Sequence, residues 1–156
     1  MRLHLIAVGR LRAGPERLLI DDYLTRLTRT GRPLSLGPAT ETEVEDRKST
    51  GPAAESLLLA RAIPPDAAIC ALDERGTQLS SPDLATQLAR WRDDGRTDAA
   101  FLVGGADGLD PSLTARADLV LSLGPMVWPH MLARVMLAEQ LYRAATILAG
   151  SPYHRA

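Results

Sequence analysis

The sequence predicts an α/β fold in which a parallel β-sheet has helices on both faces. The first observation is that segments of strand and helix character alternate along the chain in the order βαβαβαβαβα. The second is that the strand predicted at residues 67–72 is nearly all apolar, as expected when helices cover both faces of a sheet. The length of 156 residues suits one core, so residues 1–156 are predicted to form a single domain.

The predicted strands are short segments bounded by turn residues or helices. They cover residues 2–8, 33–36, 67–72, 99–103 and 119–123. Residues 40–52 are polar and include Gly51 and Pro52, which predicts a loop between the second strand and the next helix.

The predicted helices are recognised from apolar residues at helical spacing and from start and stop signals. The first begins at Pro15, because proline is favoured in the first helical turn. Ser81 begins the third, and Asp110 is a natural N-cap for a short fourth helix. Gly150 and Pro152 end the last helix. The helices cover residues 15–29, residues 53–62, the segment after residue 81, a short segment after residue 110, and residues 130–148.

The composition is that of an ordinary globular domain, with 46% hydrophobic and 24% charged residues. The chain has no apolar run of about 18 residues, so no transmembrane helix is expected, and its first residues do not resemble a signal peptide. Its single cysteine, Cys70, lies in an apolar run, which predicts a buried thiol and excludes an intramolecular disulfide and a cysteine metal cluster. These features favour a cytoplasmic protein that needs neither a metal nor a membrane.

Positive charge is unevenly distributed, although the net charge of the chain is only −1. Residues 10–32 contain six arginines and three acidic residues, and residues 125–156 contain three arginines and one acidic residue. Lys48 is the only lysine, a bias that also fits a GC-rich genome. Because arginine binds phosphate through a planar fork, both segments are candidate nucleic-acid contacts. The arginines of the first segment are Arg10, Arg12, Arg17, Arg26, Arg29 and Arg32.

Loops that are rich in glycine or otherwise unusual follow three of the predicted strands. They are LDERG at residues 72–76, GGADG at residues 104–108 and LGPM at residues 123–126. Ligands of parallel α/β sheets bind beyond the carboxyl ends of the strands, where these loops would converge, and glycine lets a backbone approach a ligand closely. The spacing GGxxG differs from the GxGxxG of dinucleotide sites. A tight turn without a ligand is the alternative for the glycine loop alone.

Several segments together resemble the ribosomal RNA large-subunit methyltransferase H family, whose members are small SPOUT methyltransferases. The resemblance covers nearly the whole chain and is most specific toward the C-terminus. The matching segments are MRLHLIAVGR, ALDERG, FLVGGADGL, WPH, RVMLAEQLYRA and PYHR. The resemblance implies a C-terminal trefoil knot whose loop backbones surround S-adenosylmethionine, a threading that protein chains generally avoid. The implied cofactor-binding residues are Leu72, Gly104, Leu123, Gly124, Pro125, Met126, Val127 and Trp128.

Two positions of the last loop depart from the family pattern. The family has a serine and later a threonine where this chain has Gly124 and Val127. Contacts made by backbone groups would survive these changes, whereas contacts made by side-chain hydroxyls would not. Residues 40–52 match the family weakly and receive no role.

The last predicted helix carries two candidate substrate-binding residues. His130 lies at the helix N-terminus, where the helix dipole disfavours its protonated form; capping or packing is the alternative role. Arg134 lies one turn further along the same face and could pair with a phosphate or with a carboxylate. Glu139 and Arg143 are spaced for a surface salt bridge.

The chain then carries an aromatic ring, an imidazole and a guanidinium side by side, at Tyr153, His154 and Arg155. Together these groups could stack on a base, exchange a proton and hold a phosphate. A solvated tail is the alternative, since chain ends usually fray. With the family resemblance, His154 becomes the candidate proton acceptor, Tyr153 a stacking or positioning residue, and Arg155 a phosphate contact.

The resemblance implies methyl transfer from S-adenosylmethionine to N3 of a pseudouridine in large-subunit ribosomal RNA, without a metal. So few positive charges would hold naked RNA weakly, and an assembled ribosome is therefore the expected substrate. A methyltransferase for another RNA, such as a tRNA, is the first alternative. A non-catalytic RNA-binding or assembly factor is the second, and the intact glycine loop argues against it.

A homodimer is also expected. The last predicted helix has more apolar residues than one buried face requires. In the family that the chain resembles, the tail of one subunit helps to complete the site of the other.

Overall fold

A parallel sheet with the strand order β2-β1-β4-β3-β5 forms the centre of the protein and confirms the predicted fold class. The structure is a computed structural model that describes residues 1–48 and 50–155. The strands are β1 (Arg2–Val8), β2 (Ala39–Val44), β3 (Ala68–Gln78), β4 (Asp98–Val103) and β5 (Leu119–Ser122).

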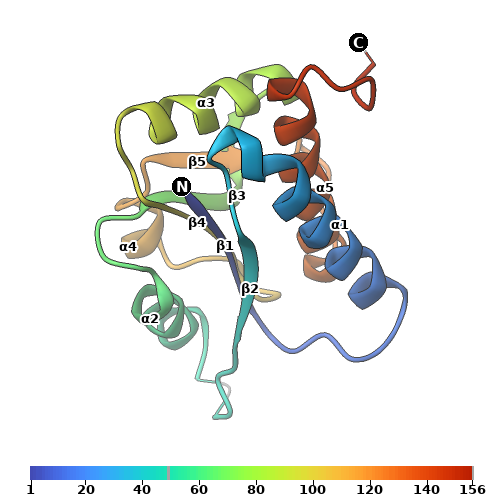
Figure 1. The fold of residues 1–156 in the computed structure, drawn as a ribbon. Helices are drawn as coiled ribbons and strands as arrows, with labels where there is room; N and C mark the ends of the chain where they lie inside the picture. The colour runs from blue at the N-terminus through green and yellow to red at the C-terminus, as the bar shows by residue number, and fades with distance from the viewer. Residues whose placement is uncertain (49, 156) are drawn as a thin grey trace.

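Helices cover both faces of this sheet, as predicted (Figure 1). On one face, α1 (Pro15–Gly31), α3 (Ser81–Asp93) and α5 (His130–Leu148) pack around an apolar cluster that includes Leu27, Phe101 and Leu137. On the other face, α2 (Pro52–Ala62) and α4 (Pro111–Thr114) pack around Leu59 and Leu102. No helix among the described residues is long and apolar enough to cross a membrane.

Most element boundaries follow the local signals of the sequence. α5 begins at His130 and ends at Leu148, as predicted. The Asp110 carboxylate accepts a hydrogen bond from the Ser112 backbone N–H at 2.9 Å, which confirms the predicted N-cap of α4. Cys70 is buried as predicted, and this burial raises the pKa of its thiol to about 12.

The second strand was predicted in the wrong place. Residues 33–36 lie in a short 3-10 helix, η1 (Arg32–Leu34), and in a turn where Ser35 has a φ of 57°. The strand is instead β2, which begins one residue before the segment predicted as a loop and otherwise lies within it. Ser49 of that predicted loop lies outside the described residues. The prediction failed because the inward side chains of β2 include the carboxylates of Glu41 and Glu43, so the strand has no apolar alternation.

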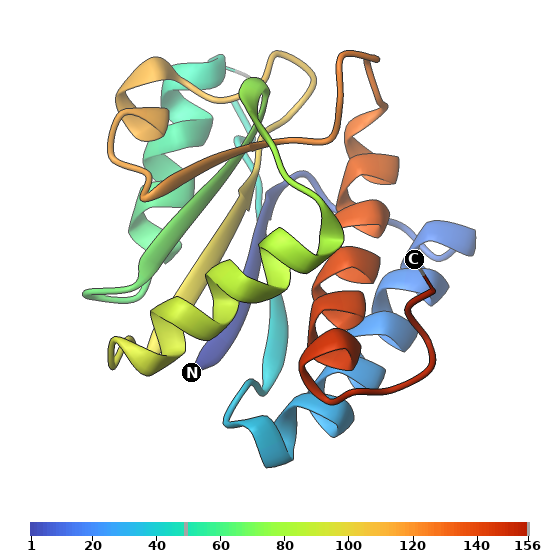
Figure 2. The ribbon, with the colours of Figure 1, turned by 90° about the horizontal axis from the view of Figure 1, so that it is seen from above.

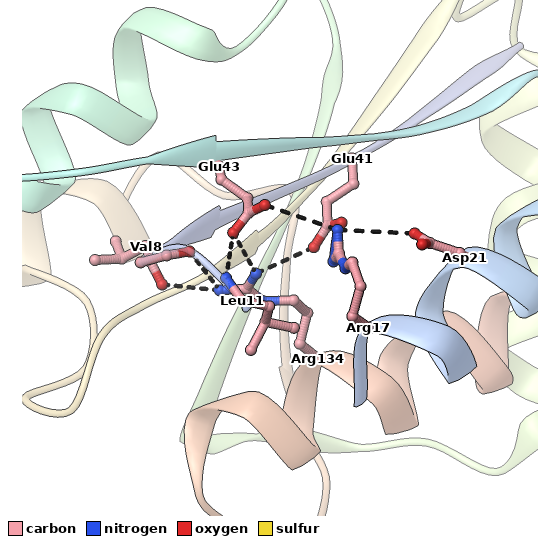
Figure 3. Close-up of polar contacts among 8 residues, drawn as sticks. Val8, Leu11, Arg17, Asp21, Glu41, Glu43 and Arg134 are labelled. Atoms are coloured by element: carbon pink, nitrogen blue, oxygen red, sulfur yellow. Dashed lines mark hydrogen bonds and ion pairs between the residues drawn. The ribbon is translucent and has the colours of Figure 1, made fainter. Parts of the chain in front are cut away.

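These two carboxylates meet two arginines in a buried ion cluster (Figure 3). The Arg134 guanidinium reaches from α5 to Glu41 Oε1 at 3.1 Å and to Glu43 Oε2 at 3.3 Å. Arg17 reaches from α1 to Glu41 and lies 3.7 Å from Glu43 Oε1. A strand that looks polar in the sequence is therefore held in the sheet because its charges are neutralised by partners on α1 and α5.

A second polar cluster lies at the opposite edge of the sheet, where β1 and β4 begin. The Asp98 carboxylate is almost fully buried and accepts hydrogen bonds from the Arg2 guanidinium at 2.8 Å and from Thr97 Oγ1 at 2.9 Å. His4 Nε2 lies 2.6 Å from Asp98 Oδ1. The hydrogen bond from Arg2 is the largest of the effects that lower the pKa of Asp98 to about 2.

We predict that Asp98 makes the free energy of unfolding depend on pH in the acid range. A carboxyl whose pKa is lower in the folded state contributes its full stability above the unfolded pKa and loses it as the pH falls through the folded pKa. The free energy of unfolding should therefore drop by about 2 kcal/mol between pH 5 and pH 2 through this group alone. Urea unfolding of the wild type and of Asp98→Asn over this range measures the difference, which the variant should lack.

Asp93→Asn is the matched control, because Asp93 also pairs with an arginine at 2.8 Å but its side chain is 65% exposed. It should change the pH dependence of unfolding much less than Asp98→Asn. Equal pH profiles for the wild type and Asp98→Asn would show that the Asp98 cluster does not stabilise the fold in this way.

Candidate active site

The three strand-end loops converge on one cavity of about 300 Å³ at the carboxyl edge of the sheet. This confirms the expectation that they meet at one edge. The cavity is lined by Leu72–Arg75 at the β3 loop, Val103–Leu109 at the glycine loop, Leu123, Gly124, Met126, Val127 and Trp128 after β5, and His130 and Ala133 on α5. Of the predicted cofactor-binding residues, only Pro125 is absent from this lining.

The glycine loop is a tight turn whose backbone groups pack on one another. A Cβ at Gly104 would lie 2.6 Å from the carbonyl carbon and oxygen of Gly108, so no side chain fits at position 104 without moving the loop. Gly105 and Gly108 form an isolated β-bridge, and Gly108 has a φ of 77°, which favours glycine. The need for Gly104 therefore comes from the loop itself, and its backbone forms part of the cavity wall.

The loop after β5 forms the mouth of the cavity. Its start is fixed by Ser122, whose buried hydroxyl donates to the Glu74 carbonyl at 3.1 Å and accepts from the Gly124 N–H at 3.1 Å. Gly124 has a φ of 110°, so the backbone conformation itself favours glycine there. The next side chains are open to solvent, with Met126 68% and Val127 84% exposed.

β3 is longer than predicted, and its ladder with β5 is interrupted beside the cavity. Both Leu72 and Thr77 are aligned with Leu121, so residues 73–76 leave the ladder as a loop. A Cβ at Gly76 would lie 2.6 Å from the Val120 carbonyl oxygen, which shows how closely this loop presses on β5. Figure 2 shows the segment after β5 passing beneath the β3 loop.

One rim of the cavity carries negative charge. Glu55 at the start of α2 lies against the glycine loop, since a Cβ at Gly105 would be 2.9 Å from its Oε2. Desolvation, followed by the nearby carboxylates of Asp107 and Asp46, raises the pKa of Glu55, while His130 acts in the opposite direction. No periodicity or motif in the sequence pointed to Glu55, and only its place in the fold shows that it belongs to this rim.

Arg134 does not face this cavity or the solvent, which corrects the prediction of a substrate-binding residue. Its side chain is 1% exposed, and besides Glu41 and Glu43 it donates to the carbonyl oxygens of Val8 and Gly9, each at 2.9 Å. From the sequence, Arg134 could pair with a phosphate or with a carboxylate. In the structure its charged partners are carboxylates. His130, the other residue predicted to bind substrate, does line the cavity.

The segment Tyr153–Arg155, called the tail below, folds back along α5 (Figure 2). The Tyr153 hydroxyl donates to Glu139 Oε1 at 2.9 Å, and the Arg143 guanidinium carbon lies 4.9 Å from the centre of the Tyr153 ring. Arg143 and Glu139 form the predicted salt bridge at 2.6 Å. It was expected at the surface, but it is half-buried under the Tyr153 ring. Burial, then the hydrogen bond to Glu139, raises the pKa of the Tyr153 phenol, so the phenol stays protonated.

The tail and the cavity lie apart within one chain. No tail residue lines the cavity, and Tyr153 contacts α5 at Glu139, nine residues beyond His130. Nine helical residues correspond to about 13 Å along the helix axis. His154 is half-buried, and its Nδ1 has no hydrogen-bond partner among residues 1–48 and 50–155.

A second cavity of about 590 Å³ lies between the first cavity and the tail. It shares Leu123 and Gly124 with the first cavity and reaches Glu139 on α5. Its wall also includes Leu19 of α1, which is 45% exposed although it is apolar. Among the described residues, no group of three or more histidine, cysteine, aspartate or glutamate side chains could hold a metal ion at either cavity.

Solved methyltransferase structures share this fold. A probable methylase family protein from Haemophilus influenzae superposes with a TM-score of 0.53 at 11% identity, covering 99% of this chain and 70% of its own. A probable methyltransferase from Bordetella pertussis superposes with a TM-score of 0.53 at 16% identity, covering 92% of this chain and 96% of its own. At these identities the likeness concerns the fold alone.

Sequence relatives are much more similar. A protein of Ruegeria pomeroyi named Ribosomal RNA large subunit methyltransferase H is 68% identical over 155 residues, which is 99% of each chain. A protein of Roseobacter denitrificans with the same name is also 68% identical over 99% of each chain. Residues 1–154 match the family described as Predicted SPOUT methyltransferase. Because this match spans the sheet, the cavity loops and most of the tail, the chain belongs to the SPOUT methyltransferase family.

Proposed function

We propose that this chain methylates large-subunit ribosomal RNA with S-adenosylmethionine as the methyl donor, and that the acceptor is N3 of a pseudouridine. The observation that carries the proposal is the full-length identity of 68% to relatives named for large-subunit ribosomal RNA methylation. The cavity at the carboxyl edge of the sheet supports it, because ligands of parallel α/β sheets bind at this edge.

The residues around the cavity fit a nucleoside-sized donor. A volume of about 300 Å³ lies at the lower end of the range for small-molecule sites. Gly104 and Gly124 keep side chains out of the wall, so backbone N–H and carbonyl groups are available to the ligand, while Leu72 and Trp128 offer apolar contacts. Such a site tolerates the absence of hydroxyls at Gly124 and Val127, where the family pattern has serine and threonine.

The tail would act on the acceptor base. When bound, the donor supplies a methyl group on a sulfonium, whose positive charge is lost on transfer, so this step needs no metal. The imide nitrogen of the base is a poor nucleophile while it holds its proton. His154 is our candidate to accept that proton, because its Nδ1 is buried and has no partner among the described residues. Arg155 is exposed and could hold a neighbouring phosphate.

Tyr153 would position the tail and not stack on the base. Its ring is already in contact with Tyr142, with ring centres 4.7 Å apart, and with Arg143. Its hydroxyl is bound to Glu139. A phenol that is anchored on both its ring and its hydroxyl fixes the path of the tail along α5, and with it the position of His154.

We further propose that the active unit is a homodimer. The tail of one chain lies apart from the cavity of the same chain, so a second copy is the natural source of the groups that act on the base. Exposed apolar side chains lie around the cavities on α1, on the loop after β5 and on α5, and their contact with a second copy would remove them from water. They are Leu18, Leu19, Met126, Val127, Trp128 and Leu132.

The C-terminal trefoil knot expected for the family is part of the same proposal. The loop at residues 73–76 presses on Val120 and is bound by the Ser122 hydroxyl. These contacts support a path in which the chain after β5 runs through the β3 loop before it enters α5. Threading of this kind would hold two of the three cavity loops at a fixed distance from each other.

We predict that Gly104→Val abolishes binding of S-adenosylmethionine. The new side chain would collide with the Gly108 backbone and distort the glycine loop. Affinity measured by titration calorimetry should fall at least about a hundredfold, or about 2.7 kcal/mol. Gly14→Ala is the control, because a Cβ there is 3.6 Å from its nearest neighbour. Wild-type affinity in a folded Gly104→Val variant would mean that this cavity is not the donor site.

We predict that two inactive variants complement each other. Gly104→Val lacks the donor site, and a chain truncated after Gly150 lacks the tail but should still bind S-adenosylmethionine. If each site combines the donor cavity of one chain with the tail of the other, mixed dimers contain one working site. Methyl transfer by the mixture, and by neither variant alone, is the expected result. Full activity of the truncated chain would remove the tail from the mechanism.

We predict that assembled ribosomes are methylated and protein-free ribosomal RNA is a poor substrate. The net charge of −1 leaves few phosphate contacts, so the shape of the ribosome must supply the remaining ones. Transfer of labelled methyl groups to each substrate measures the difference, and mass mapping of the product identifies the modified atom. Equal labelling of both substrates would refute the ribosome requirement, and labelling of another RNA alone would refute the proposed function.

A further inference from the structure

The arginine-rich segment at residues 10–32 divides into three parts in the structure. Arg17 is in the buried ion cluster, and Arg26 pairs with Asp22 at 2.8 Å. Arg29 and Arg32 lie at the far end of α1, just before Gly37, whose N–H donates to the Met1 carbonyl at the amino edge of the sheet. Only Arg10 and Arg12 remain at the carboxyl edge, where the cavity lies.

Arg10 and Arg12 lie on the loop between β1 and α1, at residues 9–14, which we call the arginine loop. Both side chains are exposed. Neither takes part in an ion pair with any of the residues that the structure describes. Their charges are therefore available to a ligand, unlike those of Arg17 and Arg26.

The arginine loop is fastened to β2 and to α5, the helix whose first turn lines the cavity (Figure 3). The Leu11 N–H donates to Glu43 Oε2 at 2.6 Å, and Arg134 donates to the Val8 and Gly9 carbonyls where the loop begins. Arg134 follows Ala133, which lines the cavity, and is one helical turn beyond His130, which also lines it. One buried guanidinium thus joins the arginine loop to the helix that forms part of the donor site.

The charge around the cavity differs from side to side. The side formed by α2, the glycine loop and the segment after β2 carries Glu55, Asp107 and Asp46, and the last two lie close enough to Glu55 to raise its pKa. The arginine loop does not line the cavity itself. It follows β1, the strand next to β4, leads into α1 on the opposite face of the sheet from α2, and carries two guanidinium groups without an ion pair among the described residues. A polyanion approaching the donor site is repelled from the first side and attracted to the arginine loop.

We propose that Arg10 and Arg12 bind the phosphate backbone of the RNA next to the methylated base, and that Glu43 and Arg134 are positioning residues that hold this arginine loop at the donor site. The inference rests on the proposed function, since it names the substrate contact of the same site. Of the arginine-rich segment at residues 10–32, it assigns only Arg10 and Arg12 to RNA binding. Arg134 would act on substrate binding indirectly, by holding the arginine loop.

The test compares two double variants that remove the same charge. Arg10→Ala with Arg12→Ala removes the proposed contacts, and Arg29→Ala with Arg32→Ala removes two exposed arginines from the far end of α1. Binding to assembled ribosomes is measured as a function of salt concentration. The first variant should make the slope of log affinity against log salt shallower by about 2, because one phosphate contact contributes about 1. The second variant should leave this slope unchanged.

The first variant should also raise KM for ribosomes about tenfold or more while its affinity for S-adenosylmethionine stays at the wild-type value. Replacing both residues by lysine should restore most of the salt dependence, because the charges return. An unchanged slope and KM in the alanine variant, with an active wild type, would overturn the inference and leave the proposed function standing. An inactive wild type on every RNA substrate would instead refute the proposed function.

The positioning role is tested with Glu43→Ala against Glu45→Ala, an exposed glutamate two residues along the chain. Loss of Glu43 removes the acceptor of the Leu11 N–H and frees the arginine loop. The expected results are faster tryptic cleavage after Arg10 or Arg12 and a shallower salt slope on ribosomes, both absent in Glu45→Ala. Unaltered cleavage and slope in the Glu43 variant would exclude Glu43 from the positioning of the arginine loop.

Discussion

The ion cluster around Arg134 is the interaction on which the arrangement of the site depends. A guanidinium withdrawn from water costs several kcal/mol unless charged and polar partners surround it. Here two carboxylates from β2 and two carbonyl groups from the end of β1 meet it, and Arg17 of α1 shares the carboxylates. β1, β2, α1 and α5 are therefore joined at one point. Removing either carboxylate would leave buried charge, so the cluster restricts these elements to one relative position.

The proposed donor cavity depends on backbone geometry, whereas the rest of the proposed site depends on side chains. Gly104 packs on Gly108, and Gly124 has a positive φ, so glycine at both places is a requirement of the local backbone. The side chains around them can vary with less effect on a ligand held by backbone groups. In the proposed mechanism His154 and Tyr153 have no such freedom, because proton transfer and anchoring would require particular side-chain atoms. The difference agrees with the sequence: the loop after β5 departs from the family pattern at Gly124 and Val127, whereas the tail matches the pattern.

The sequence predicted the helices and strands that local signals specify. It failed where a contact between residues far apart in the chain determines the structure. Apolar runs, proline at helix starts and Asp110 as an N-cap gave α5 and α4 with correct starts. β2 was missed because Glu41 and Glu43 look like loop residues until Arg134, far along the chain, is known to neutralise them. The same contact decides between the two partners that the sequence left open for Arg134, a phosphate or a carboxylate, in favour of the carboxylate. Convergence of the strand-end loops could be predicted, since the carboxyl ends of parallel strands share an edge.

α5 relates the three proposed parts of the site to one another. Within its first ten residues it presents His130 to the donor cavity, Arg134 to the arginine loop and Glu139 to Tyr153 of the tail. These positions span about 13 Å of helix, and each further residue turns the face by about 100°. A rigid helix therefore fixes both the separation and the direction of cavity, loop and tail. The same helix keeps the tail at a distance from its own cavity, and the proposed second copy would bridge this distance.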